Sequence, residues 1–139
     1  MSLGDYIRYL RALHGAPTPS QIAAACGLPH GGVITQIEQR YRRMGTDEEL
    51  EKLAAYFNVP VEELKWRREK YRKAFSRFVH QAMIEGTPVR LHLRLGETLT
   101  GWIKWWDLGA VGLEPEDGGP LIVVQRHAVD DWEPVTVDK

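Results

Sequence analysis

The sequence predicts two small domains in series, an all-helical one followed by a β one. Apolar residues recur at helical spacing up to about residue 86 and at every second position beyond it. Between the two patterns stands Gly86-Thr87-Pro88, which ends a helix. Helices followed by strands without alternation indicate separate domains. We place them at residues 1–70 and 71–139, since a chain of 139 residues has room for two small domains.

Five helical segments are expected in the first domain. They span about 3–14, 19–26, 32–43, 47–57 and 61–85. In the fourth, Leu50, Leu53, Ala54 and Phe57 follow the i, i+3, i+4, i+7 spacing of a buried helix face. Thr46-Asp47-Glu48-Glu49 forms a capping box that begins this helix.

The second and third segments predict a helix-turn-helix. Ala23 is small enough for two helices to pack closely, and Gly27 tolerates the positive φ of the turn. Ile34 and Ile37 place an apolar stripe on the next helix, which leaves its polar residues facing outward.

These residues resemble the Cro/repressor-type (XRE-like) helix-turn-helix family over about residues 3–66. The matching motifs are Ile7-x-x-Leu10-Arg11, Gln21-Ile22-Ala23, Cys26-Gly27-Leu28, Ile34-x-x-Ile37-Glu38 and Leu50-x-x-Leu53-Ala54-x-x-Phe57-Asn58-Val59-Pro60-Val61-Glu62-Glu63-Leu64. The resemblance implies that the third helix enters the major groove of duplex DNA. Because Gly31-Gly32 replaces polar side chains at its start, the expected DNA contacts lie further on, at Thr35, Gln36, Gln39, Arg40, Arg42 and Arg43.

Charge is distributed unevenly along the chain. Residues 1–96 carry 15 Lys/Arg against 10 Asp/Glu, whereas residues 97–139 carry 3 against 9. Polyanion binding is therefore expected in the first two-thirds, with a solvated helix face as the alternative reading of the basic run. Expected phosphate contacts in that run are Lys65, Arg67, Arg68 and Lys70.

The second domain is predicted to be a small β structure preceded by a helix. Val89, Leu91, Leu93 and Leu95 alternate with polar residues, as in a half-buried strand. Glycines punctuate the following short segments, and Leu121-Ile122-Val123-Val124 indicates a buried strand.

Residues 75–134 resemble the Hfq/Sm-like family. The matching segments are Leu95-Gly96-Glu97-Thr98-Leu99-Thr100-Gly101-Trp102-Ile103, Trp105-Trp106-Asp107 and Val124-Gln125-Arg126-His127-Ala128-Val129. The resemblance implies a five-stranded β-barrel that forms a homo-oligomeric ring. The edge strands expected to pair between neighbours are Leu121–Gln125 and Ala128–Glu133.

The same resemblance gives a possible RNA pocket at Arg126 and His127. Its stacking aromatic is replaced by Gly109, which offers no ring. Stacking contributes about 1–3 kcal/mol per base, and the surrounding segment is acidic. RNA binding is therefore expected to be weak, and assembly is the preferred reading of this domain.

No enzyme, metal site or cofactor is predicted. The five histidines are scattered without ligand spacing, and no glycine-rich phosphate loop follows a strand. No apolar run approaches the ~20 residues that span a bilayer. A single cysteine, Cys26, and the lack of a secretory leader lead us to expect a cytoplasmic protein.

The leading hypothesis is a DNA-binding transcriptional regulator that its Sm-like domain multimerises. Joining several weak DNA-binding units can raise avidity about 10²–10⁴-fold. Two alternatives stay open. One is an Hfq-like RNA-binding riboregulator whose helical domain serves protein interaction, and the other is an assembly protein without nucleic acid.

Overall fold

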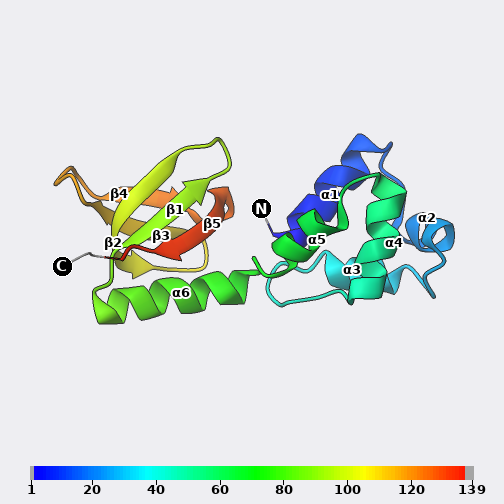
Figure 1. Cartoon of the computed structure of the whole chain (residues 1–139), viewed down its shortest axis with the longest axis horizontal. Coiled ribbons are helices and arrows are strands. Elements are labelled where there is room, and N and C mark those ends of the chain that lie inside the picture. Colours follow the sequence, from blue (N-terminus) through cyan, green and yellow to red (C-terminus); the bar gives the residue numbers. More distant parts are fainter. Residues whose placement is uncertain (1, 137–139) are drawn as a thin grey trace. The chain divides into compact units, whose positions relative to one another are not determined.

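Five helices build the first unit of the chain, Ser2–Lys73 (Figure 1). The computed structural model describes residues 2–136. The helices are α1 (Leu3–Leu13), α2 (Pro19–Cys26), α3 (Gly32–Ile37), α4 (Asp47–Phe57) and α5 (Val61–Arg68). The second unit begins at Ala74, shortly after the predicted boundary.

Local signals begin and end several of these helices. Thr18 and Thr46 each accept a hydrogen bond from the backbone N–H three residues on and complete a capping box. Gly27, at φ 73°, ends α2, and Asn58, at φ 55°, ends α4, both in the left-handed conformation typical of helix C-termini. The helix boundaries at α2 and α4 therefore follow from the sequence alone.

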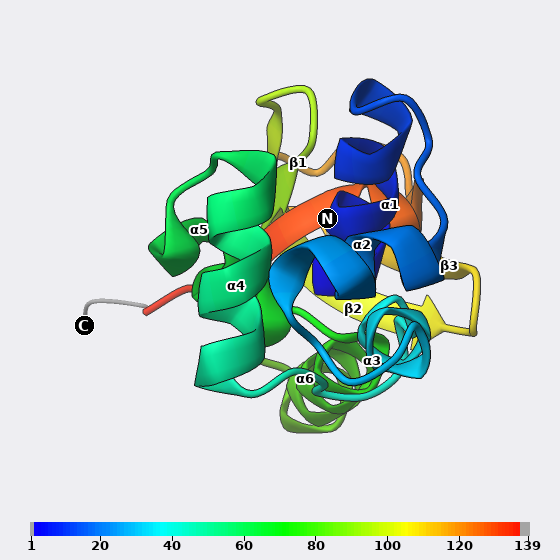
Figure 2. The same ribbon diagram turned by 90° about the vertical axis from the view of Figure 1, so that its right-hand side faces the viewer.

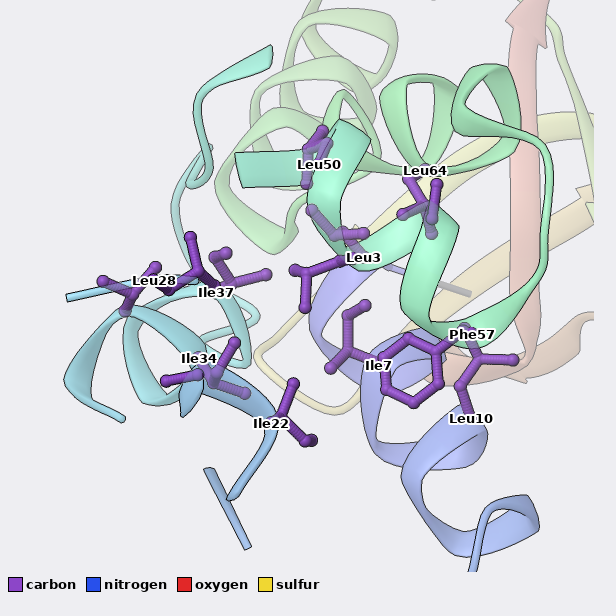
Figure 3. Close-up of a cluster of buried hydrophobic side chains, with 14 residues drawn as sticks. Leu3, Ile7, Leu10, Ile22, Leu28, Ile34, Ile37, Leu50, Phe57 and Leu64 are labelled. Carbon is purple, nitrogen blue, oxygen red and sulfur yellow. The ribbon is translucent and has the colours of Figure 1, made fainter. Parts of the chain in front are cut away.

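One apolar cluster joins the five helices. Ile7, Ile22 and Leu50, from α1, α2 and α4, are fully buried in it. In Figure 3 the labelled side chains converge from all five helices, with Ile7 beside the ring of Phe57. Figure 2 looks onto this unit and shows α1, α2, α3 and α4 grouped around that centre.

Helix α3 is shorter than predicted, and the expected span 32–43 was wrong. The helix ends at Ile37, because the start of α1 packs across its end. A Cβ on Gly4 would lie 2.5 Å from the carbonyl oxygen of Glu38, so the two backbones touch. The buried Glu38 carboxylate accepts from Arg8 and Arg11 of α1.

The predicted helix 61–85 is two helices, α5 and α6 (Arg72–Glu85). The backbone N–H of Arg72 donates to the carbonyl oxygen of Arg40 at 2.6 Å, and that of Lys73 donates to Tyr41 at 3.0 Å. These donors are thus used by a distant loop instead of the preceding turn. A continuous helix cannot form where its N–H groups bind elsewhere.

The second unit contains five antiparallel strands after α6, as predicted. They are β1 (Val89–Leu93), β2 (Thr98–Trp106), β3 (Ala110–Pro115), β4 (Ile122–Gln125) and β5 (Val129–Pro134). A single 3₁₀ turn, Arg126–Ala128, joins β4 to β5. The order in the sheet is β4-β3-β2-β1-β5 (Figure 1).

The sheet is bent but is not a closed barrel, which corrects the prediction. At Gly101 a Cβ would lie 2.1 Å from the carbonyl oxygen of Glu114, so only glycine permits this close strand contact. Register shifts interrupt the β2–β3 and β1–β5 pairs. Because β4 and β5 lie at opposite edges and do not pair with each other, both edges stay open within the described chain.

Helix α6 covers part of this sheet. Phe75, Val79 and Ala82 are buried from the helix side, and Val89 and Leu113 are buried from the strands. The ring of Phe75 packs 4.9 Å from that of Trp132 on β5. The unit thus has its own apolar core, separate from that of the helices.

Candidate assembly edges and nucleic-acid surfaces

Strand β4 presents an open backbone edge. The N–H of Arg126 donates to the carbonyl oxygen of Gly109 at 3.0 Å, in line with the β3–β4 register. Antiparallel ladders alternate between pairs that exchange hydrogen bonds and pairs that do not. Positions 122 and 124 therefore bond to β3, while the N–H and C=O groups of Val123 and Gln125 point outward.

The side chains of β4 suit an interface as well. Val123 is 61% exposed and Leu121 is 48% exposed, and no charged residue lies between them and Gln125. An uncharged, partly apolar open edge is a template for strand pairing. Of the two predicted pairing strands, β4 is the one whose outward N–H and C=O groups are available to a neighbouring strand.

Strand β5 forms the other edge, and its outward backbone donors are either absent or already hydrogen-bonded. The N–H of Val135 donates to the carbonyl oxygen of Pro88, so the alternation turns the backbone of Trp132 and Pro134 outward. Proline has no N–H. The Trp132 N–H donates at 2.8 Å to the carboxylate of the adjacent Asp131. On this edge, the outward N–H of Trp132 is therefore already bonded to a side chain of the same strand.

Arg126, half of the predicted RNA pocket, is buried with an exposed fraction of only 4%. Its guanidinium donates to the carbonyl oxygen of Asp107 at 2.8 Å and to the hydroxyl of Ser76 at 2.6 Å. It also packs over the rings of Phe75 and Trp106. These contacts join α6 to the sheet, and they direct Arg126 inward.

His127 and Gly109 are exposed beside that buried arginine. Asp107 accepts hydrogen bonds from the N–H groups of Gly109 and Ala110, and these bonds hold the pKa of its carboxyl below the usual range. A Cβ on Gly109 would meet only the Asp107 carboxylate, at 3.7 Å. The structure brings His127 and Gly109 together but provides no stacking ring at position 109.

Of the predicted DNA contacts, only Thr35 and Gln36 lie on α3, where both are exposed. Gln39, Arg40, Arg42 and Arg43 lie in the loop that follows the helix, and the single helical face predicted for them is not observed. The glycine at position 31 has a packing reason. A Cβ there would lie 2.8 Å from the backbone nitrogen of Ser20 in α2.

Two basic segments far apart in sequence are joined by backbone hydrogen bonds. The bonds from Arg72 and Lys73 to the carbonyls of Arg40 and Tyr41 place them side by side. Arg43 pairs with Glu69 at 2.8 Å, and Arg40 lies 3.5 Å from Asp5. The basic loop, residues 39–43, therefore adjoins the start of α6.

The predicted phosphate contacts on α5 are largely engaged within the protein. Arg68 is buried and donates to Asp47 at 2.7 Å and to the carbonyl of Gly45. Arg67 donates to Glu63 and packs over the rings of Tyr6 and Trp66. The ammonium of Lys70 also lies over the Trp66 ring, and Lys65 is partly exposed.

Nothing in residues 2–136 gathers three or more His, Cys, Asp or Glu side chains where they could hold a metal ion. Across the same residues, no helix is both long and apolar enough to cross a membrane.

Comparisons with solved structures give remote likenesses. No family model matches the chain, and no curated protein matches it. A solved structure of the pleiotropic translational regulator Hfq is similar at TM-score 0.39 and 19% identity, over 42% of this chain and 93% of that one. An Hfq protein from Anabaena sp. is similar at TM-score 0.39 and 20% identity, over 44% of this chain and 95% of that one.

The sequence predicted Leu121–Gln125 and Ala128–Glu133 as edge strands but not the roles of single residues within them. Neither Val123 nor Asp131 was singled out. Pro134 was an available signal, because proline in a strand indicates an edge.

Proposed function

We propose that this chain is a self-assembling protein whose C-terminal, Sm-like unit joins copies edge to edge. The observation that carries the proposal is that β4 and β5, at opposite ends of one sheet, each lack a neighbouring strand on one side within residues 2–136. Pairing β4 of one copy with β5 of the next is a head-to-tail contact, and such contacts close into a ring when the rotation permits. Strand pairing between copies also removes the exposed apolar edge at Val123.

The test is the mass of the full-length protein in solution as its concentration rises. The proposal expects one discrete oligomer, because a closed ring has a fixed number of copies. A ladder of growing species would indicate an open filament and would argue against closure. The proposal includes no catalytic step and no cofactor.

A second function, duplex DNA binding by the helical unit, is favoured by one specific observation. The exposed Thr35 and Gln36 of α3 are followed directly by the basic loop, which the Arg72 and Lys73 bonds tie to further cations. Amide side chains suit adenine edges and cations suit phosphates. Assembly would present several such surfaces at once and raise avidity if they engage together. This is the multimeric regulator of the leading hypothesis.

RNA binding at Arg126 and His127 is the less favoured alternative. The inward contacts of Arg126 leave His127 as the exposed member of the pair. The described part of the second unit, residues 74–136, carries 5 Lys/Arg against 9 Asp/Glu. Long-range attraction for a polyanion is small on such a surface.

A further inference from the structure

We infer that Asp131 is a gate on assembly: its carboxylate occupies the backbone donor of β5 that a neighbouring copy must bind. The inference rests on the proposed assembly function and names the residue that controls it. The gate is local, since Asp131 and the N–H it binds are adjacent in sequence and 2.8 Å apart.

The regular part of the β1–β5 pairing, residues 131–135, shows which backbone groups of β5 face outward. Val135, Glu133 and Asp131 direct their backbone groups to β1, by the alternation that the Val135–Pro88 bond fixes. Trp132 and Pro134 direct theirs outward, and proline supplies no donor. The N–H of Trp132 is therefore the single outward donor on the segment 131–135.

A second copy would offer the matching acceptor. On β4 the carbonyl groups of Val123 and Gln125 face outward, and no side chain within residues 2–136 bonds to them. An incoming β4 carbonyl and the Asp131 carboxylate thus compete for the same hydrogen. A carboxylate is the stronger acceptor, because hydrogen bonds to charged groups exceed neutral ones.

The two edges are therefore unequal. β4 is open and uncharged, whereas β5 carries a side-chain cap and a proline, the devices by which proteins discourage unwanted strand pairing. The Asp131 carboxylate occupies the Trp132 N–H until a strand from a neighbouring copy pairs along enough of β5 to displace it. The cap then sets the strength of assembly.

The experiment measures the association constant of the full chain by sedimentation equilibrium for wild type and three variants. Asp131→Ala removes the competitor, and we expect association to tighten about tenfold per interface, the order of one net hydrogen bond. Asp131→Asn removes the charge but keeps an acceptor oxygen, so its effect should be intermediate. Asp130→Ala is the matched control: it removes the same charge one residue away, and we expect less than a twofold change.

The outcomes separate the gate from the assembly it acts on. Equal association constants for wild type, Asp131→Ala and Asp131→Asn overturn the gate and leave assembly standing. Equal tightening by Asp130→Ala and Asp131→Ala also overturns it, since general charge repulsion then explains the effect. If none of the four proteins associates, the assembly function fails and the gate fails with it.

Discussion

The backbone N–H of Arg126 donates to the carbonyl oxygen of Gly109 at 3.0 Å, and this single bond fixes which way β4 faces. Since the ladder alternates, Ile122 and Val124 bond to β3 within the chain, while the N–H and C=O groups of Val123 point outward. Two neighbouring residues of one strand thus have different backbone roles.

A pair of proline substitutions separates those roles. Val123→Pro removes an outward donor and should weaken association about tenfold or more, with little loss of fold stability, because edge strands tolerate proline. Ile122→Pro removes a donor to β3 and should lower the free energy of unfolding of the second unit by about 1–3 kcal/mol. Sedimentation and thermal unfolding, run on both variants, measure the two effects. Equal loss of fold stability in the two variants contradicts the assigned alternation.

Arg126 is expected to stabilise the second unit rather than to bind a ligand. Arg126→Ala leaves Ser76 and the Asp107 carbonyl without their donor and removes packing from Phe75 and Trp106. We expect it to lower the free energy of unfolding by about 2–4 kcal/mol. The exposed neighbour gives the control, since His127→Ala should change stability by less than about 0.5 kcal/mol. Chemical denaturation measures both. A stable Arg126→Ala protein would show that the inward contacts contribute little.

Gly109→Phe tests the weak RNA site. Wild type should bind a short oligo-U only weakly at physiological salt, because no ring is present to stack on a base. The position is exposed, its φ lies outside the left-handed region, and a Cβ has room. A phenylalanine there should raise affinity about tenfold, within the 1–3 kcal/mol that stacking contributes. Fluorescence anisotropy measures it. Tight binding by wild type that His127→Ala abolishes would make the riboregulator the better reading.

Arg42→Ala tests the DNA surface. Losing one phosphate contact should reduce the magnitude of the salt slope by about 1 and weaken all duplex sequences alike. Lys104→Ala, on β2 of the second unit and paired with Glu114 at 2.9 Å, removes the same charge outside the helical unit and should change neither. By contrast, Gln36→Ala should change sequence preference, because its amide is placed to read a base edge. If the full chain binds no duplex from a genomic selection at low salt, the DNA function fails.

The sequence predicts best those features that short segments determine. The capping box at Thr46, the turn glycine Gly27 and the alternation from Val89 onward correctly locate the start of α4, the end of α2 and the first strand. The end of α3 escaped prediction because it depends on Gly4 packing against Glu38, a contact between residues far apart in the chain.

Contacts of the same long range set the remaining differences. The break between α5 and α6 depends on carbonyl groups in the 40–41 loop. Which backbone groups of β4 and β5 face outward depends on strand register, and a shift of one residue would reverse it. The sequence predicted the two edge strands, but the roles of Val123 and Asp131 within them could be recognised only from the register of the sheet.

The central claim is that copies of this chain join through the edges of one sheet, and sedimentation velocity of the full-length wild type at tens of micromolar tests it most directly. The account predicts a single oligomeric species that Val123→Pro converts to smaller ones. A wild type that sediments as a monomer at these concentrations, with no change in Val123→Pro or Asp131→Ala, would contradict it.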